Sequence, residues 1–335
     1  MKKEKIKKTY IGGQAVMEGL MLKGKTAYAT AVRDPDGNVQ IESKRITPPE
    51  KRSKLSRFPI IRGVINFVES LVLGFKVLMR SADVAAEEEE TPSKVEKWLA
   101  EKHKVSITSV IEFFSVVLAI VFAFAIFFLA PQLLTKAISR WVGWGESPKG
   151  LDLLWFNLVE GGVRMAIFIA YITLITISKT LRRTYMYHGA EHKTIRCYEA
   201  GLPLTVDNVR PQTRLHPRCG TSFLLVVMVI SILVFSVASS ALLTAVPALE
   251  AIRGTLGYRL LMVVFKLALL PIVVGITYEI NRWCGRKDNA LTRALSAPGM
   301  WIQNFTTYEP DDAMIEVAIA AVQAVLPEEE GADRW

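Results

Sequence analysis

The run SFLLVVMVISILVFSVASSALLTAVPAL, residues Ser222–Leu249, decides the fold class of this chain. It carries no charged side chain, and it exceeds the roughly 20 residues that an α-helix needs to cross the hydrocarbon core of a bilayer. Three other runs are also long and apolar enough, namely Ile107–Ala130, Gly162–Leu181 and Leu256–Ile280. The sequence therefore predicts four transmembrane helices, and Pro271 is placed to kink the last of them.

The composition is typical of a protein that is partly embedded in a membrane. Of the 335 residues, 51% are hydrophobic and 22% are charged, which is too apolar for an ordinary soluble protein and too charged for spans alone. The net charge of +9 fits lysine and arginine retained beside anionic lipid head groups, and no specific nucleic-acid motif accompanies it. The three cysteines, Cys197, Cys219 and Cys284, do not form the pattern of a disulfide framework.

The placement of the basic residues predicts the orientation of the spans. The segment between the second and third runs holds seven of them: Arg182, Arg183, Lys193, Arg196, Arg210, Arg214 and Arg218. The two loops on the opposite side carry fewer, which are Lys136, Arg140, Lys149 and Arg253. Because short loops rich in lysine and arginine stay in the cytoplasm, both termini and the 182–221 loop are expected there.

A fifth apolar stretch, Phe58–Met79, is interrupted by polar residues at helical spacing. They are Arg62, Asn66, Glu69, Lys76 and, just beyond, Arg80. These positions fall on one face of a helix. A full span here would invert the orientation, so we expect an amphipathic helix that lies in the cytoplasmic interface or re-enters the membrane. An ordinary helix packed on the membrane domain satisfies the same pattern.

The sequence YHGAEH, Tyr187–His192, begins a few residues after the second span. On a helix, His188 and His192 lie one turn apart on the same face, where both imidazoles can reach one metal ion. Glu191 lies beside them, placed to act on a water molecule or to hold a ligand in position. The order H-x-x-E-H is that of a known group of zinc proteases.

A second group, HPRC at His216–Cys219, directly precedes the third span. Its histidine and cysteine have the two-residue separation that is common among zinc ligands. The predicted metal ligands are therefore His188, His192, His216 and Cys219, with Cys197 and Glu199 in reserve. Imidazole together with thiolate favours zinc over other ions. The alternative is that these histidines cap helices or bind phospholipid head groups.

The number of protein ligands decides what such a site does. Four of them would close a tetrahedron and make the site structural, whereas three and a water would leave it catalytic with Glu191 as general base. The residue types favour neither arrangement. Glu18, in the glycine-flanked stretch GGQAVMEG at Gly12–Gly19, is a further acidic group that the fold could bring to the site.

These features define the expected architecture: mainly α, a polytopic membrane helix bundle of four spans, with an interfacial or re-entrant helix and a small β-containing N-terminal region. A hairpin is expected from Tyr28–Val32 and Val39–Ile46, and a short helix at Asp311–Leu326. The predicted segments are a cytoplasmic β-rich region (1–57), the amphipathic helix (58–82), an acidic linker (83–105), a first transmembrane pair (106–181), a cytoplasmic metal-binding loop (182–221), a second transmembrane pair (222–281) and a cytoplasmic C-terminal region (282–335).

Several of these stretches together resemble the YqhQ-like family, a bacterial domain of unknown function. The matching segments are GGQAVMEG at Gly12–Gly19, the helix at Phe58–Ala82, YHGAEHKTIRCYEAG at Tyr187–Gly201, HPRCGTSF at His216–Phe223, TYEINR at Thr277–Arg282 and EPDDAMIEVAIAA near the C-terminus. The resemblance implies a metal-dependent protein of the bacterial cytoplasmic (inner) membrane and importance of the 58–80 helix. It implies no substrate.

Two functions follow as hypotheses. The first is a zinc-dependent, hydrolytic enzyme that acts at the cytoplasmic membrane face, with Glu191 as the catalytic residue. The second is a non-enzymatic insertion or assembly factor for membrane proteins, in which a structural zinc stiffens a basic surface. Expected partners are the lipid bilayer and its anionic head groups, and in the second case other membrane proteins, the ribosome or a translocase. A transporter would rest on Lys266 and Pro271 alone, without a visible inverted repeat.

Overall fold

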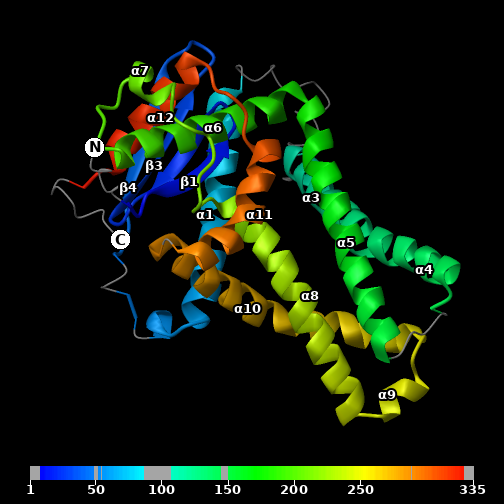
Figure 1. Ribbon diagram of the computed structural model, residues 1–335. Helices are drawn as coiled ribbons and strands as arrows, with labels where there is room; N and C mark the ends of the chain where they lie inside the picture. The colour runs from blue at the N-terminus through cyan, green and yellow to red at the C-terminus, as the bar shows by residue number, and fades with distance from the viewer. Residues whose placement is uncertain are drawn as a thin grey trace. The chain divides into compact units, whose positions relative to one another are not determined.

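The computed structural model describes residues 8–48, 52–53, 55–86, 107–144, 150–287 and 289–327. The chain is mainly helical, with one small antiparallel sheet near its N-terminus (Figure 1). It divides into two compact units, which are described separately: unit 1 is Met1–Ala85 with Ile172–Trp335, and unit 2 is Ala86–Tyr171. The larger part of the predicted acidic linker, 83–105, lies outside the described residues.

The strands are β1 (Gly12–Val16), β2 (Gly19–Lys23), β3 (Ala27–Arg33) and β4 (Val39–Arg45). The helices before the metal-site region are η2 (Leu55–Arg57), α1 (Ile61–Ala85), α3 (Ile107–Phe124), the π-helix η3 (Ala125–Leu129), α4 (Ala130–Val142), α5 (Gly150–Leu174) and η4 (Ile175–Ile177). The remaining helices are α6 (Lys179–Glu199), α7 (Val206–Val209), α8 (Gly220–Ala245), α9 (Ala248–Ala251), α10 (Leu256–Arg286), α11 (Ala290–Thr306) and α12 (Asp312–Val325).

Four helical segments of the described chain are long and apolar enough to cross a membrane. They are Phe114–Val142, Trp155–Ile177, Phe223–Ala245 and Leu256–Arg286. The predicted number of spans is therefore confirmed, and the chain is a polytopic membrane protein. The predicted second run continues to Leu181, but its helix ends earlier because Ser178 adopts an extended backbone and α6 starts at Lys179.

In unit 2, a proline explains how a charged side chain is held within a span. Pro131 has no N–H, so the carbonyl of Phe127 four residues earlier lacks the donor that an α-helix would supply. Arg164 Nε donates to this carbonyl at 3.1 Å, and Arg164 pairs with Glu160 at 2.6 Å. Both charges and the freed carbonyl therefore have partners inside the unit, as the low dielectric of a membrane requires.

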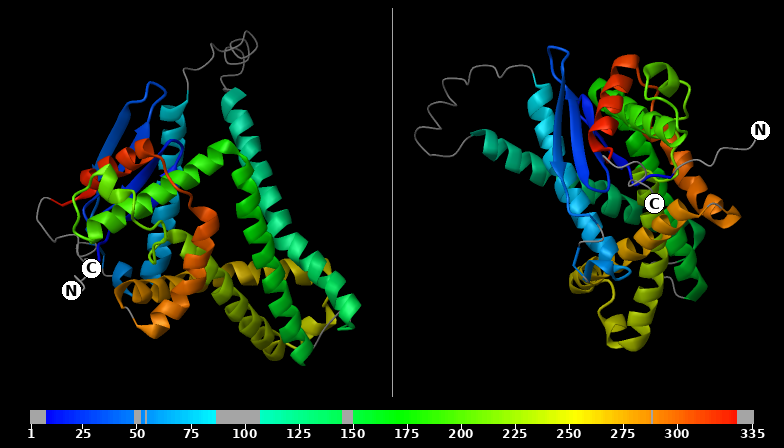
Figure 2. Two further views of the ribbon diagram at one scale, coloured as in Figure 1. Left: turned by 45° about the horizontal axis from the view of Figure 1, so that its top comes forward. Right: turned by 90° about the vertical axis from the view of Figure 1, so that its left-hand side faces the viewer.

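In unit 1, the four strands form a meander in the order β1-β2-β3-β4. The predicted hairpin is confirmed as β3 and β4, and the glycine-flanked stretch 12–19 supplies β1 and the turn into β2. One face of the sheet packs on α6 and α12 through Leu20 and Leu22, and the other packs on α1 through Met21. Because side chains alternate between faces, consecutive apolar residues of β2 contact both helical layers. Figure 2 shows the sheet between α1 on one side and α6 with α12 on the other.

The C-terminal part of unit 1 contains one predicted helix and one that was not predicted. The expected helix 311–326 is α12, and the Asp311 side chain caps it by accepting from Met314 N. Helix α11 has no counterpart among the predicted elements, because Pro298 followed by Gly299 is typical of a turn. It forms nevertheless, packs on α8, and buries Ile302 and Gln303.

Candidate metal centre

Helix α6 contains most of the candidate site residues of unit 1, and these residues are buried. Its residues from Tyr187 to Ile195 are all buried, although histidine, glutamate, lysine and threonine are among them. Burying polar groups is costly unless each has a partner. The sequence between 187 and 195 is therefore not explained by hydrophobic packing alone, and the partners of its polar side chains define the site.

Both predicted histidines of α6 are held through one ring nitrogen. His188 Nδ1 lies 2.8 Å from the carbonyl oxygen of Thr306, and His192 Nδ1 lies against the carbonyl oxygen of Arg214. A carbonyl only accepts, so each Nδ1 carries a proton, and Nε2 is the atom that can bind a metal ion once it is unprotonated. This is how metal-binding histidines are commonly oriented, with the second nitrogen bonded to a backbone carbonyl.

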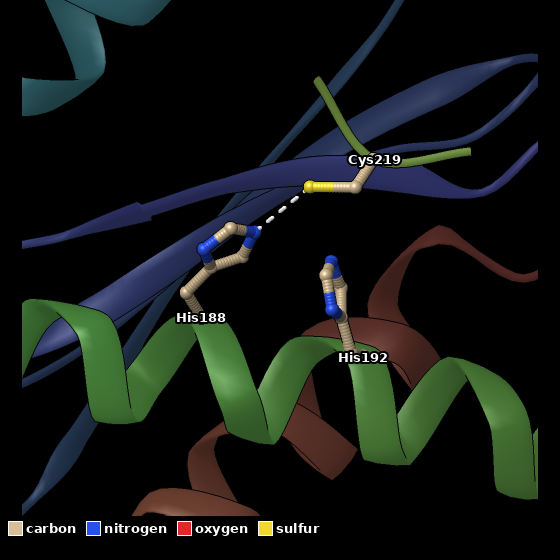
Figure 3. A group of neighbouring side chains, drawn as sticks. All are labelled: His188, His192 and Cys219. Carbon is tan, nitrogen blue, oxygen red and sulfur yellow. Dashed lines mark hydrogen bonds between the residues drawn. The ribbon is translucent and has the colours of Figure 1, made fainter. Parts of the chain in front are cut away.

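Cys219 completes a three-residue group with these histidines, defined here as the His–Cys cluster. It is the N-cap residue of α8, and its sulfur lies 3.1 Å from His188 Nε2. One ligand atom from each of His188, His192 and Cys219 lies within 4.8 Å of the other two, and all three residues are buried. Figure 3 shows both rings rising from α6 toward the sulfur. Ligand bonds of about 2.0–2.3 Å to a tetrahedral zinc ion place the ligand atoms about 3.3–3.6 Å apart. The pair of His188 Nε2 and Cys219 Sγ would therefore open slightly when zinc binds.

Electrostatics keep the cluster in the protonation state of an ion pair. Burial alone would raise the pKa of the Cys219 thiol, but the charges of His188 and His192 and hydrogen bonds from them lower it well below its usual range. Burial would likewise lower the pKa of His188, yet the Cys219 charge and hydrogen bond raise it to about 9. A thiolate is the form of cysteine that binds metals, so the ligand is already prepared.

Glu191 stands next to the cluster with one oxygen engaged and one free of protein partners. Its Oε1 accepts from Gly13 N at 3.0 Å, which ties the GGQAVMEG stretch to α6. Its Oε2 is buried and has no hydrogen-bond partner among the described residues. Burial raises the pKa of this carboxyl, and the charges of His188 and His192 offset part of the rise. A buried carboxylate oxygen without a donor marks a place for a water, an ion or a substrate group.

His216, the predicted fourth ligand, lies beside the cluster but is engaged elsewhere. Its Nε2 faces Glu199 Oε2 at 3.6 Å, and its ring centroid is 5.5 Å from that of His192. The Gln303 side chain clamps its backbone by accepting from His216 N and donating to His216 O, both at 2.7 Å. His216 as a metal ligand therefore stays a prediction, and the structure places its ring in a separate pair with Glu199.

The two reserve ligands occupy other surroundings. Glu199 accepts from Thr9 N at 2.9 Å and pairs with Arg218 as well as facing His216. Burial would raise the pKa of Glu199, but the hydrogen bond with His216 and the Arg218 charge lower it. Cys197 is buried in a different apolar cluster, and burial raises the pKa of its thiol. Neither residue belongs to the His–Cys cluster.

Glu18 reaches α6 at a point one turn away from the cluster. Its carboxylate makes two hydrogen bonds of 2.6 Å with Arg183, and this pairing lowers the pKa of Glu18. Glu18 thus holds the β1–β2 turn against α6 and does not enter the cluster. The contacts that sequence reasoning missed are the carbonyls of Thr306 and Arg214, the Gly13 amide and the Gln303 side chain. Three of these are backbone groups, which leave no trace in residue type.

Comparison with known proteins gives two matches. The family described as "Protein of unknown function (DUF1385)" matches residues 58–328. A curated relative, "Uncharacterized protein YqhQ" from Bacillus subtilis (strain 168), is 32% identical over 329 residues, which cover 97% of this chain and 95% of the relative. No solved structure matches the chain. The matched segment contains the whole His–Cys cluster, and neither description assigns an activity.

Proposed function

Because this chain belongs to DUF1385, a family whose description names no activity, we propose from its own geometry that it is a zinc-dependent hydrolase of the bacterial cytoplasmic membrane. The observation that supports the proposal is a group of three possible ligands, His188, His192 and Cys219, beside a buried carboxylate. Oε2 of that carboxylate, Glu191, has no hydrogen-bond partner among the described residues. Three protein ligands and one open position are typical of catalytic zinc, whereas structural zinc has four.

The donor set supports zinc as the ion. Two imidazole nitrogens and one thiolate match borderline-soft cations, and tetrahedral geometry with mixed nitrogen and sulfur ligands is typical of Zn²⁺. A zinc ion bound there would act as a Lewis acid toward a water molecule or toward a substrate carbonyl or phosphoryl oxygen. The anchored Nδ1 atoms of both histidines would keep their rings in place when the ion binds.

Glu191 supplies the proton-transfer group in this proposal. It is set against the cluster by the hydrogen bond from Gly13 N, and its second oxygen is the one without a partner. Burial raises the pKa of Glu191, which brings a carboxylate closer to the range in which it accepts and returns a proton efficiently. The proposal thus assigns proton transfer to a buried carboxylate that interacts electrostatically with the cluster and has one oxygen without a partner among the described residues.

The position of Cys219 supports a substrate at the membrane surface. Cys219 is followed at once by α8, whose membrane-spanning segment begins at Phe223. Four residues of helix rise by about 6 Å, so the sulfur lies within roughly one helical turn of the span. A lipid-linked substrate or a peptide bond close to the bilayer surface is the class of substrate that fits this position. The orientation toward the cytoplasm rests on the distribution of basic residues.

We expect Glu191→Gln to keep its zinc and to lose turnover by about 100- to 10,000-fold, the usual contribution of a general base. Zinc content is measured by inductively coupled plasma mass spectrometry on protein in phospholipid nanodiscs. Hydrolysis is followed with fluorogenic ester, phosphodiester and peptide substrates carrying an acyl anchor. Glu18→Gln is the matched control, because that carboxylate pairs with Arg183 outside the cluster. Undiminished turnover in zinc-loaded Glu191→Gln would remove Glu191 from the chemistry.

The affinity for zinc should also depend on pH in a defined way. In the metal-free protein the cluster holds one proton on His188, because that pKa is raised to about 9 while Cys219 is a thiolate. Zinc must displace this proton, so binding strengthens by about tenfold per pH unit up to about pH 9 and then levels off. Competition with a chromophoric chelator between neutral and alkaline pH measures the slope. A flat profile over that range contradicts the assignment of the proton.

The nearly complete burial of the site residues favours a second candidate function, because a substrate would have little access to them. This function is a membrane-protein insertion or assembly factor with a structural zinc. His192 is 1% exposed and Glu191 is 4% exposed, so a zinc ion could serve to fasten α6 to the segment before α8. Other membrane proteins, the ribosome or a translocase would then be the partners of the basic surface. In that case Glu191→Gln leaves function intact while Cys219→Ala abolishes it, which separates the two candidates.

A further inference from the structure

Helix α1 presents three different faces, and two of them are occupied by the rest of unit 1. The first is lined by its buried residues, Gly63, Gly74, Val77 and Ser81. Three of these four are small, which lets neighbouring backbones approach closely. A Cβ on Gly63 would lie 2.8 Å from the Cβ of Tyr278, so α1 touches α10 directly at this point. Gln14 Nε2 donates to Gly74 O at 3.0 Å, and Met17 N donates to Ser81 Oγ at 3.3 Å, so the sheet holds the rest of this face.

The second face is the polar stripe predicted from the sequence, and it is engaged in ion pairs. Arg62 pairs with Glu279 of α10. Glu69 pairs with Arg52 at 3.0 Å, and Arg80 pairs with Glu42 of β4 at 2.8 Å. The partners come from the segment before α1, from α10 and from β4, so protein covers this face at both ends of α1 and the helix is not surrounded by lipid as a full span would be.

The third face is apolar and exposed. Seven large side chains lie on it, each 39–65% exposed: Ile61, Val68, Leu71, Val72, Phe75, Leu78 and Met79. Their spacing of three, four and seven residues places them on a continuous arc of the helix. A stripe of this size is larger than the scattered apolar residues of an ordinary protein surface, so it marks a contact with something apolar.

We propose that this face of α1 lies in the interfacial layer of the bilayer, with its side chains inserted into the lipid below the head groups. Lipid is the expected contact of this face because α1 adjoins the exposed apolar surface of the candidate membrane span α10. The exposed apolar residues of α10 run from Leu256 to Ile272, and α1 meets α10 just beyond, where Gly63 packs on Gly275 and Tyr278. Helix α10 rises by about 28 Å between Leu256 and Gly275, close to the roughly 30 Å of a hydrocarbon core. Helix α1 therefore meets α10 at the depth where hydrocarbon gives way to head groups.

The direction and charge of α1 fit the same surface. Figures 1 and 2 show α1 crossing the end of α10 instead of running along it, as a helix in the membrane plane would. Lys76, a member of the predicted polar stripe, is exposed and lies at the edge of the stripe next to the apolar arc. Its ammonium group can reach anionic phosphate there while its stem follows the apolar arc. The helix would thereby hold the sheet, α6 and the His–Cys cluster at the bilayer surface.

The test measures the depth of spin labels on full-length protein in nanodiscs of phosphatidylethanolamine and phosphatidylglycerol. Nitroxides are attached to Val72→Cys and Phe75→Cys, in a Cys284→Ser background because Cys284 is the partly exposed native cysteine. Val72 and Phe75 are 65% and 61% exposed, so the substitutions remove little packing. Lys76→Cys on the same turn and Ser43→Cys on the exposed strand β4 are the matched controls. Each labelled variant is first required to match the parent in circular dichroism and melting temperature.

We expect the ratio of oxygen to water-soluble nickel-complex collision rates to be severalfold higher at positions 72 and 75 than at 43, with position 76 between them. High nickel accessibility at 72 and 75 overturns the proposal, because the face would then be in water. Dipolar broadening at 72 and 75 that disappears on dilution with unlabelled protein also overturns it, since a second copy of the chain would then cover the face. Both outcomes are independent of zinc and of hydrolysis.

Discussion

Replacing Cys219 with alanine is expected to weaken zinc binding by about 100- to 1000-fold. Structural zinc sites bind with apparent free energies of about 10–16 kcal/mol, so the loss of one of four ligand positions costs on the order of 3–4 kcal/mol. Cys219 is the one cysteine of the cluster, and its charge raises the pKa of His188. The same loss is expected for His188→Ala and His192→Ala.

The measurement is zinc per chain after dialysis against a chelator of graded strength. Cys284→Ala is the control, because Cys284 lies on α10 outside the cluster and its loss leaves all three ligand atoms in place. The variants should remain folded, since Cys219 is small and caps a long helix that is stabilised along its length by apolar contacts. One zinc per chain in both Cys219→Ala and His188→Ala, at wild-type affinity, would show that the ion is held elsewhere.

The second large effect is expected at Gly189, which directly follows the site residue His188. A Cβ at position 189 would lie 2.0 Å from the carbonyl oxygen of Tyr308, and Tyr308 N already donates to Tyr185 O at 3.0 Å. Two backbones meet here, so the clash cannot be relieved by turning a flexible side chain. We expect Gly189→Ala to lower the free energy of unfolding by about 3 kcal/mol or more.

This clash should also reach the metal site. The segment that must move carries Thr306, whose carbonyl holds His188 Nδ1, and loss of such an outer contact costs about 10- to 100-fold in metal affinity. Melting of the zinc-free and zinc-loaded protein, followed by intrinsic fluorescence, gives both effects. Gly220→Ala is the matched control, because a Cβ at that helical glycine meets nothing within 4 Å. Equal melting temperatures for Gly189→Ala and the wild type would contradict the close approach.

The membrane part of the fold was readable from the sequence because span length is a one-dimensional property. In a bilayer, an uncharged apolar run such as Ser222–Leu249 can satisfy its backbone hydrogen bonds within the segment only as a helix. The structure has a candidate spanning segment at Phe223–Ala245. The β3–β4 hairpin was equally readable, since the turn at Asp34–Asn38 brings together two strands that are adjacent in the chain. The ends of the elements were less predictable. The second span stops where Ser178 adopts an extended backbone, and the number of apolar residues in the run does not indicate this end.

The candidate site was predictable only where it is local. His188 and His192 share a helical face by spacing alone, and Cys219 was predicted as a candidate ligand from its residue type and its spacing to His216. The groups that hold them come from far along the chain, since His188 and Thr306 are 118 positions apart and Gly13 and Glu191 are 178 positions apart. His216 shows the limit most clearly. Its spacing to Cys219 is typical of zinc ligands, yet the fold supplies Glu199 and Arg218 as competing neighbours.

The position of Glu199 explains why the ring of His216 pairs with a carboxylate and does not join the His–Cys cluster. Its carboxylate is almost fully buried and needs partners, which it finds in Thr9, Arg218 and His216. Among the residues that the structure describes, Glu191 by contrast has one hydrogen-bond donor, Gly13 N, and its Oε2 has none. The two carboxylates of α6 thus differ in how well they are satisfied, and the poorly satisfied one lies at the cluster.

X-ray absorption at the zinc edge of the purified wild-type protein would identify the metal ligands. We expect one zinc per chain, bound by one sulfur and two imidazole nitrogens with one further oxygen ligand, and a sulfur shell that disappears in Cys219→Ala. The three residues that would supply the protein ligands are His188, His192 and Cys219. Protein that binds no zinc, or a zinc spectrum without a sulfur ligand, would contradict this expectation.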